Sequence, residues 1–180
     1  MLPAYWISNY IIDTIKILAL SVIAIIFIYI YEVSVDYAWL ALLLYPFAVV
    51  PYTYFFSFLF PSEDSGEKFA LIHNFVLGGI IALAVFILRI ISSTREVGIA
   101  FFWVLKFLPM YCLCEAIIDS ASISLLGTAF AKPTKVYSTA MEIDVSGSAI
   151  IFLFLQAIFY PILVFLVEIG AFTFCFKYIK

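Results

Sequence analysis

The sequence predicts an all-α protein, a polytopic bundle of transmembrane helices that includes a re-entrant helical hairpin. Hydrophobic residues make up 67% of the chain and charged residues only 12%, and the mean hydropathy is +1.21, which is far from the composition of a water-soluble domain. Long uncharged runs alternate with short polar segments, and one apolar stretch is too short to cross a bilayer. The 180 residues give room for a single transmembrane domain.

Three long apolar runs in the first half of the chain predict three full spans. They cover about residues 10–31, 37–61 and 69–91. Each is long enough for the ~30 Å hydrocarbon core of a bilayer. Pro46 and Pro51 fall inside the second run, which predicts a bent helix, because membrane helices tolerate proline where neighbours satisfy the freed carbonyl groups. The polar segment 61–68 contains turn formers and predicts a loop.

The region 98–126 predicts a different kind of membrane segment. Its first part, residues 98–108, is apolar but would extend only about 16 Å as a helix, half of the bilayer core. Pro109 interrupts the run, and a second apolar piece follows. We therefore expect a re-entrant hairpin with its tip near Pro109, since irregular backbone at membrane depth is tolerated where protein covers it. One kinked span over residues 99–125 is the alternative interpretation.

The rest of the chain predicts a polar loop followed by a last span. The loop covers residues 127–147, and the span covers about residues 148–174 with Pro161 near its middle. Basic residues do not fix the orientation in the membrane. With both termini in the cytoplasm, four of the nine basic residues would lie inside and five outside, which slightly opposes the positive-inside rule.

Motifs that carry chemistry are sparse. No phosphate-binding G-x-x-x-x-G-K-[ST] motif occurs, and the single histidine, His73, cannot form a catalytic triad or dyad on its own. Cys112, Cys114 and Cys175 lie inside apolar segments, which favours small buried side chains over a disulfide framework or a metal site. We therefore expect no catalytic, cofactor-binding or metal-binding residue in this chain. The absence of a basic run gives no reason to expect a nucleic-acid partner.

A polar face on the first helix is one candidate site for a partner. A helix that begins near residue 3 would carry four side chains on one narrow face: Trp6, Asn9, Asp13 and Lys16. This face is either a surface that a cytoplasmic partner contacts or an interfacial anchor. In the second interpretation Trp6 belongs to the aromatic belt and Asp13 pairs with Lys16.

Glu115 and Asp119 are a second candidate site. They lie one helical turn apart, so the second half of the expected hairpin carries two carboxylates on one face. Paired carboxylates can serve acid–base chemistry or bind a cation. No histidine accompanies them, however, and we interpret them as a face of the hairpin that is exposed to water.

Polar residues also occur inside or at the ends of the predicted spans. Glu168 and Gln156 lie in the last span, and an ionisable group at membrane depth is a candidate functional residue because its burial is unfavourable. Glu168 is near the exit and can alternatively reach the interface or pair with Lys177. Arg89 and His73, at the two ends of the third span, are interpreted as interfacial anchors.

Two stretches in the first third of the chain resemble the transmembrane domain of ABC transporters of subfamily A. Residues 2–13 read Leu-Pro-Ala-Tyr-Trp-Ile-Ser-Asn-Tyr-Ile-Ile-Asp. They resemble the Tyr-Trp-x-x-Asn-Phe-x-x-Asp stretch with which that family begins the helix after its coupling helices. The matching residues are Tyr5, Trp6, Asn9 and Asp13. The segments 42–47 and 51–60 look like the next helix of that family, which ends in a short cytoplasmic loop.

A third stretch carries the resemblance into the predicted hairpin. Residues 107–119 read Phe-Leu-Pro-Met-Tyr-Cys-Leu-Cys-Glu-Ala-Ile-Ile-Asp. They are similar to the family's Phe-Pro-x-Phe-Cys-x-Gly-x-Gly-Leu segment, the turn of an outward-facing helical hairpin. Cys114 and Ala116 stand where that family usually has glycines. The three stretches occur in the family's order and span most of the chain.

The resemblance implies an ATP-driven exporter of phospholipid or sterol, in which closure of nucleotide-binding domains rocks two membrane halves. This chain would supply the third to sixth helices of one half, as a fragment without the nucleotide-binding domain. ATP and Mg²⁺ would bind only to that absent domain. The implied partners are membrane lipids, a nucleotide-binding domain and the second transmembrane half.

The resemblance also implies an orientation. Both termini and the segment 61–68 would face the cytoplasm, and the hairpin would lie near the outer leaflet. Two other functions remain open from the sequence. The chain could be a permease subunit of another ABC exporter, or a stand-alone structural membrane protein.

Overall fold

The computed structural model describes residues 2–33, 35, 37–60, 62–122 and 141–169. All regular elements among these residues are helices, so the all-α prediction is confirmed. They are α1 (Leu2–Ile30), α2 (Ala38–Ser57), α3 (Glu63–Asn74), η1 (Phe75–Ile81), α4 (Ala82–Ile90), α5 (Arg95–Leu105), α6 (Pro109–Ala121), η2 (Ile143–Gly147) and α8 (Ser148–Glu168). The two η elements are π-helical.

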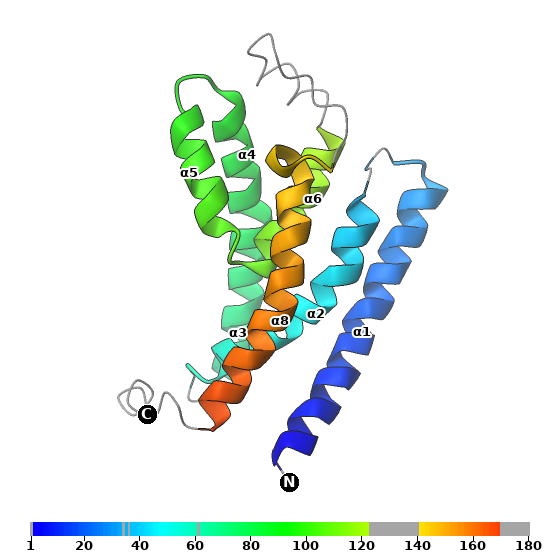
Figure 1. Cartoon of the computed structure of the whole chain (residues 1–180), viewed down its shortest axis with the longest axis vertical. Helices are drawn as coiled ribbons and strands as arrows, with labels where there is room; N and C mark the ends of the chain where they lie inside the picture. The colour runs from blue at the N-terminus through cyan, green and yellow to red at the C-terminus, as the bar shows by residue number, and fades with distance from the viewer. Residues whose placement is uncertain (1, 34, 36, 61, 123–140, 170–180) are drawn as a thin grey trace.

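The long helices lie side by side along one common direction (Figure 1). α1 and α2 run in opposite directions, and α3, η1 and α4 together form one rod that runs parallel to α1. α8 returns to the end of the bundle at which α1 begins. The start of α1 and the end of α8 therefore lie at the same end.

Four helical segments are long and apolar enough to cross a membrane. They are Trp6–Ile30, Ala38–Ser57, Asp64–Ile90 and Val145–Glu168. Each overlaps one of the four predicted full spans, so the prediction of a polytopic helical bundle is confirmed. Residues 170–174 of the last predicted span, residues 123–126 of the predicted hairpin and residues 127–140 of the predicted loop lie outside the described residues. The predicted end of that loop at residue 147 is wrong, because η2 (Ile143–Gly147) is already helical and leads directly into α8.

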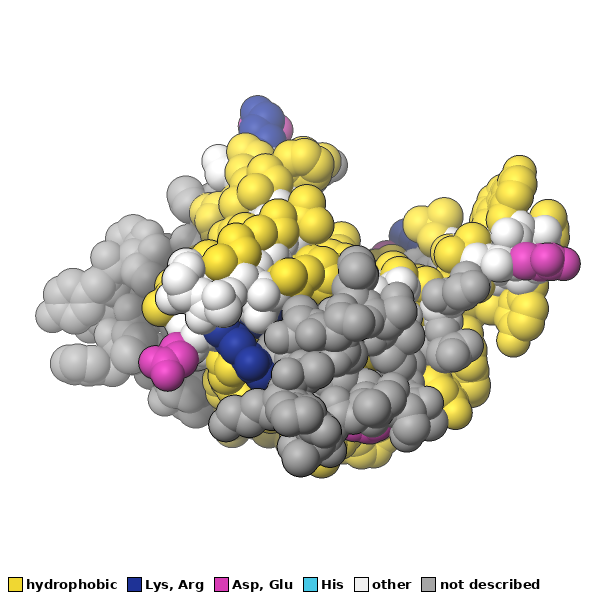
Figure 2. All heavy atoms as spheres, turned by 90° about the horizontal axis from the view of Figure 1, so that it is seen from above, with side chains coloured by type: hydrophobic (Ala, Val, Ile, Leu, Met, Phe, Trp, Pro, Cys, Tyr) yellow, Lys and Arg dark blue, Asp and Glu magenta, His cyan; other side chains and the backbone are white. Residues whose placement is uncertain are grey.

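Hydrophobic side chains cover much of the described surface. Viewed from the end at which α4 connects to α5, yellow hydrophobic atoms predominate and charged groups are confined to a few points (Figure 2). Leu20 and Val104, for example, are 66% and 65% exposed. Apolar exposure on this scale is unfavourable in water and is typical of a surface that faces lipid.

The polar segment 61–68 is mostly helical, which corrects the prediction of a loop. α3 begins directly after Ser62, whose side-chain oxygen accepts a hydrogen bond from the backbone N–H of Ser65 at 3.4 Å. Asp64 and Lys68 form an exposed i,i+4 ion pair of 2.8 Å. A capped start and an i,i+4 pair both favour helix. These polar residues are therefore the first turns of the rod that continues as η1 and α4.

The chain reverses its direction between α5 and α6, over residues 106–108. α5 ends near the middle of the length of the bundle, and α6 runs back toward the end at which α5 began (Figure 1). Pro109 is in the first turn of α6, where its missing N–H removes no helical hydrogen bond. The reversal lies where Pro109 predicts it, whereas its re-entrant placement in a membrane stays a prediction.

α6 contributes to both hydrophobic clusters of the bundle. The larger cluster joins α2, α6 and α8, and several of its fully buried members are alanines: Ala41, Ala48, Ala116 and Ala149. Small side chains let helix backbones approach closely. The smaller cluster joins α4, α5 and α6 through Val85, Phe102 and Tyr111. α6 is therefore surrounded by other helices, and its polar side chains have to find partners inside the protein.

Candidate functional site

Both carboxylates of α6 are buried inside the protein. The side chains of Glu115 and Asp119 are 3% and 1% exposed, so the interpretation of this face as exposed to water is wrong. The polar face of α6 turns inward because two basic side chains from neighbouring segments meet it there.

Each carboxylate forms an ion pair with a buried basic residue. Arg89, in the last turn of α4, donates from Nη1 to Oδ2 of Asp119 at 2.7 Å. Lys106, directly after α5, donates from Nζ to Oε1 of Glu115. The side chains of Arg89 and Lys106 are 4% and 0% exposed, so the interpretation of Arg89 as an interfacial anchor is also wrong. We call these four residues the buried ion-pair cluster.

The ring of Phe102, on α5, lies against both cations of the cluster. Its centroid is 4.1 Å from Cζ of Arg89 and 3.8 Å from Nζ of Lys106. A desolvated cation over a ring face is attracted by the quadrupole of the ring. Gly98, on the same helix, permits close approach to α4, since a Cβ there would lie 2.9 Å from the backbone nitrogen of Arg89. Phe102 and Gly98 thus help to bring the two cations together.

Side chains of α6 and α8 satisfy the backbone carbonyls of the link between α5 and α6. Nε2 of Gln156 donates to the carbonyl of Lys106 at 2.5 Å, and Sγ of Cys112 donates to the same oxygen at 3.1 Å. The hydroxyl of Tyr160 donates to the carbonyl of Phe107 at 2.5 Å. Non-helical backbone away from water needs such partners. Gln156 and Tyr160 therefore fix the tip of the reversal against α8.

The chemistry of the cluster suits positioning better than catalysis. Its two positive and two negative groups balance. Each carboxylate contacts its cation through one oxygen only. The other oxygens, Oε2 of Glu115 and Oδ1 of Asp119, have no hydrogen-bond partner among the described residues. No group of three metal-ligating side chains occurs in the part of the chain that the structure describes. Separation of either pair would leave a buried charge without its partner, which is unfavourable. The two pairs therefore hold α4 and the link between α5 and α6 against α6.

Tyr160→Phe is expected to lower the free energy of unfolding by about 1–3 kcal/mol, because the carbonyl of Phe107 would lose the hydroxyl that donates to it. Unfolding by SDS in mixed micelles measures the change. Tyr45→Phe is the matched control, since its hydroxyl donates to the sulfur of Met110 at 3.1 Å, which is a weak acceptor. Equal losses in the two variants would contradict a special role for the Tyr160 hydrogen bond.

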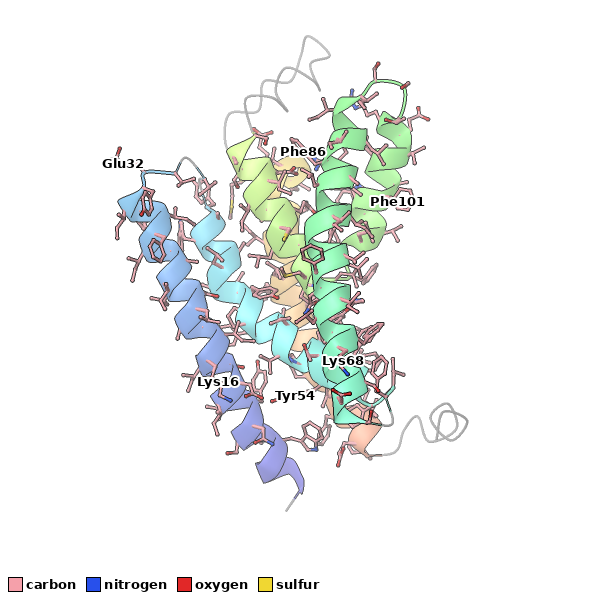
Figure 3. The ribbon with its side chains drawn as sticks, turned by 180° about the vertical axis from the view of Figure 1, so that it is seen from behind. Lys16, Glu32, Tyr54, Lys68, Phe86 and Phe101 are labelled. Atoms are coloured by element: carbon pink, nitrogen blue, oxygen red, sulfur yellow. The ribbon has the colours of Figure 1, made fainter. Side chains whose placement is uncertain are left out.

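The polar face of α1 packs against α2. The hydroxyl of Tyr54 donates to Oδ2 of Asp13 at 2.5 Å, and the rings of Trp6 and Tyr54 meet edge to face with centroids 5.4 Å apart. Lys16 donates to Oδ1 of Asp13 at 2.9 Å, the pair that the interpretation as an interfacial anchor includes; Lys16 and Tyr54 are marked in Figure 3. Asn9 is half-buried. Contacts within the chain therefore cover part of the face that is a candidate for a partner.

Tyr10 also joins α1 to α2, at a carbonyl that a proline leaves free. Pro51 has no N–H, so the carbonyl of Phe47 lacks its usual helical partner. The hydroxyl of Tyr10 donates to that carbonyl at 3.4 Å. The proline within α2 is thus accommodated by a neighbouring helix, as the sequence predicts.

Tyr54→Phe is expected to lower the free energy of unfolding by about 1 kcal/mol, because Asp13 would lose a donor while the packing of the ring is kept. The same SDS titration measures it. Tyr29→Phe serves as the control, since Tyr29 is 70% exposed and its hydroxyl is expected to contribute nothing. No loss in Tyr54→Phe would show that this hydrogen bond does not hold α1 in place.

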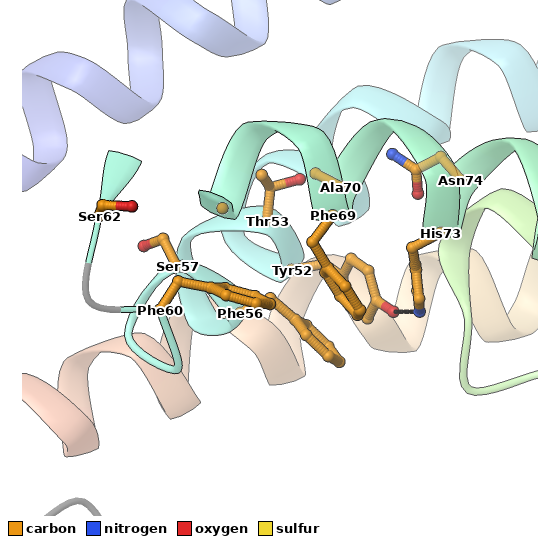
Figure 4. A pocket seen from close by; sticks show the side chains of 11 residues that line it. Tyr52, Thr53, Phe56, Ser57, Phe60, Ser62, Phe69, Ala70, His73 and Asn74 are labelled. Atoms are coloured by element: carbon orange, nitrogen blue, oxygen red, sulfur yellow. Dashed lines mark hydrogen bonds between the residues drawn. The ribbon is translucent and has the colours of Figure 1, made fainter. Parts of the chain in front are cut away.

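A cavity of about 460 Å³ lies between the end of α2 and the start of α3 (Figure 4). Its wall is largely aromatic and includes Tyr52, Phe56 and Phe69. The hydroxyl of Tyr52 and Nε2 of His73 are 3.1 Å apart. His73, interpreted from the sequence as an anchor, therefore forms a hydrogen bond between helices. None of the described residues that line this cavity is Asp, Glu, Lys or Arg.

Glu168 lines a second cavity, of about 470 Å³, together with Trp6 and Tyr54. Its side chain is half-buried in the last turn of α8. Lys177, the partner considered from the sequence, lies outside the described residues. The structure thus brings together Trp6 and Glu168, two candidates that the sequence places in separate sites.

Sequence reasoning missed Arg89 and Lys106 as partners of the two carboxylates. A signal was present, because carboxylates in an apolar segment require nearby positive charge, and both basic residues flank the same region. The pairing of Arg89 with Asp119 spans 30 positions, however. It depends on the packing of α4 against α6, which no local pattern specifies.

Compared with known proteins, the chain matches no protein-family model and no curated protein. The fold and the cluster define its class: a polytopic bundle of helices, four of which are long and apolar enough to cross a membrane, with a chain reversal held by buried ion pairs.

Proposed function

We propose that the chain is the membrane-spanning part of an ATP-driven ABC exporter of subfamily A and takes part in lipid translocation. The observation that carries the proposal is the chain reversal at residues 106–108. Three long apolar segments precede two short helices that meet near the middle of the bundle, and one long apolar helix follows. The resemblance implies this order of elements at these positions. The start of α1 and the end of α8 lie at the same end of the bundle (Figure 1), which supports placing both on one side of the membrane; the resemblance implies that this is the cytoplasmic side.

In such an exporter this chain would contribute helix movement rather than chemistry. The nucleotide-binding domain would bind ATP and Mg²⁺, and its closure would move the membrane helices. The buried ion-pair cluster joins α4 and the link to α6, so these segments would move as one body. α1 packs mainly on α2 and would be free to shift relative to that body. Lipids and the second membrane half would contact the exposed apolar flanks.

The length of the transcript tests the proposal first. We expect the reading frame to continue past Lys180 into a segment with G-x-x-x-x-G-K-[ST]. The encoded product, reconstituted in liposomes with a fluorescent phospholipid, is expected to move the label between leaflets only with ATP and Mg²⁺. Alanine in place of the lysine of that motif is the control and should abolish the movement.

Two results would overturn the proposal. One is a full-length product that binds ATP but moves no lipid in an ATP-dependent way. The other is a mature message that ends after Lys180 and whose product shows no ATP-dependent movement with any separate ATPase chain encoded beside it. The second result would favour a structural membrane protein.

A further inference from the structure

A groove between α1, α2 and α8 lies near the end of the bundle at which α1 begins. It encloses about 470 Å³, and its apolar wall includes Ile7, Pro51, Pro161, Val164 and Phe165. Pro51 and Pro161 lie inside α2 and α8. Proline disturbs the regular helix at its own position. Two of the three helices that form the groove therefore lack one backbone hydrogen bond beside it.

Among the residues that the structure describes, nothing closes the groove toward the side of the bundle. Ile7, Phe165 and Ile169, which border it, are 59%, 56% and 64% exposed. Val164, at its back, is 8% exposed. A flexible hydrocarbon chain that lies alongside the protein can therefore enter without displacement of any helix. The apolar wall favours such a chain over water.

Aromatic side chains indicate the depth of the groove in a membrane. Trp6 and Tyr10 of α1 and Tyr54 of α2 line it. Tryptophan and tyrosine concentrate where the hydrocarbon core meets the headgroups, and the candidate span of α1 begins at Trp6. The groove therefore lies at the level at which a lipid headgroup joins its acyl chains.

Glu168 is the one charged side chain among the described residues that line the groove. A half-buried carboxylate in an apolar wall favours a positive partner. The nearby carboxylate of Asp13 is already bonded to Lys16 and Tyr54. The wall thus complements a ligand that combines a hydrocarbon chain with a positive group and repels a ligand with a net negative headgroup.

We propose that the groove binds one phospholipid with an ammonium headgroup, ethanolamine or choline. An acyl chain lies on the apolar wall, and the ammonium group lies against the carboxylate of Glu168. The site requires only that the chain sits in a membrane. It does not depend on ATP-driven export, and its failure would leave that proposal standing.

Quenching of Trp6 by lipids with brominated chains tests the site, because Trp6 lines the groove. A variant with Trp39→Phe and Trp103→Phe keeps Trp6 as its single tryptophan. It is reconstituted in phosphatidylcholine with a minor fraction of brominated phosphatidylethanolamine, phosphatidylcholine or phosphatidylglycerol. We expect phosphatidylethanolamine and phosphatidylcholine, whose headgroups carry an ammonium group, to bind about two- to fivefold more tightly than phosphatidylglycerol, the range of a partly exposed ion pair.

Charge variants and a second reporter complete the test. Glu168→Gln is expected to remove the headgroup preference, and Glu168→Lys to reverse it toward phosphatidylglycerol. Glu32→Gln, at the far end of α1 (Figure 3), is the matched control and should keep the preference. A variant that retains only Trp103, which is 42% exposed on α5, should show no preference.

Three results would overturn the inference. They are an absence of quenching at Trp6, equal quenching by all three headgroups, and a preference that survives Glu168→Gln. If Glu168→Lys does not fold, as judged by circular dichroism, the comparison of the three headgroups on the parent protein and on Glu168→Gln still tests the inference.

Discussion

Lys106→Met is expected to lower the free energy of unfolding by about 3–5 kcal/mol, because the buried carboxyl group of Glu115 would lose the cation that stabilises its charged form. The side chains of Lys106 and Glu115 are 0% and 3% exposed, so water does not replace the lost partner. Methionine has a similar length, which limits any loss of packing. Unfolding by SDS in mixed micelles, followed by circular dichroism, measures the change.

The double variant Lys106→Met with Glu115→Leu separates charge from packing. Replacement of a buried ion pair by apolar residues of similar volume is often neutral or stabilising, so we expect it to recover most of the stability that Lys106→Met loses. A double variant as unstable as the single one would contradict the account, since packing rather than the ion pair would then explain the loss.

Asp119→Ala is expected to lower the free energy of unfolding by about 3 kcal/mol or more, because Arg89 would lose a carboxylate inside the protein. The bond is 2.7 Å long, and the Arg89 guanidinium also lies over the Phe102 ring, which holds it in place. The same SDS titration measures the loss.

Asp64→Ala is the matched control for Asp119→Ala. Asp64 and Lys68 form an ion pair of similar length, 2.8 Å, but their side chains are 76% and 71% exposed. An exposed i,i+4 pair contributes only about 0.3–0.5 kcal/mol. Similar losses at the two positions would show that burial does not strengthen the Arg89–Asp119 pair.

Much of the helix pattern can be predicted from the sequence, because the bilayer imposes it. Uncharged runs of sufficient length predict all four apolar segments, and the short run before Pro109 predicts the reversal. The helical structure of segment 61–68 is harder to predict, because its serines and glycine are typical of loops. The cap at Ser62 and the Asp64–Lys68 pair nevertheless make it helical. Local composition does not determine whether such a polar segment caps a helix or forms a loop.

The candidate site is less predictable than the helices. The pattern of α6 shows that Glu115 and Asp119 share a face, but not whether water or protein meets that face. The answer depends on Arg89 and Lys106, which reach the cluster through the packing of α4 against α6 and through the chain reversal after α5. Gln156, which donates to the carbonyl of Lys106 in the link, lies 50 positions away in the sequence. Such contacts depend on tertiary packing rather than on local sequence.

The depth of the link between α5 and α6 in the membrane tests the central claim most directly. Single cysteines at Ser62, Ser93 and Phe107, in a chain whose own cysteines are alanine, can be labelled with a membrane-impermeant maleimide from either side of sealed vesicles. We predict that the cysteines at 62 and 93 react from opposite sides and that the one at 107 reacts from neither. Phe107 is 63% exposed, so protection there would come from lipid. Labelling of position 107 from the side on which position 62 reacts would contradict the account, because α5 would then cross the membrane.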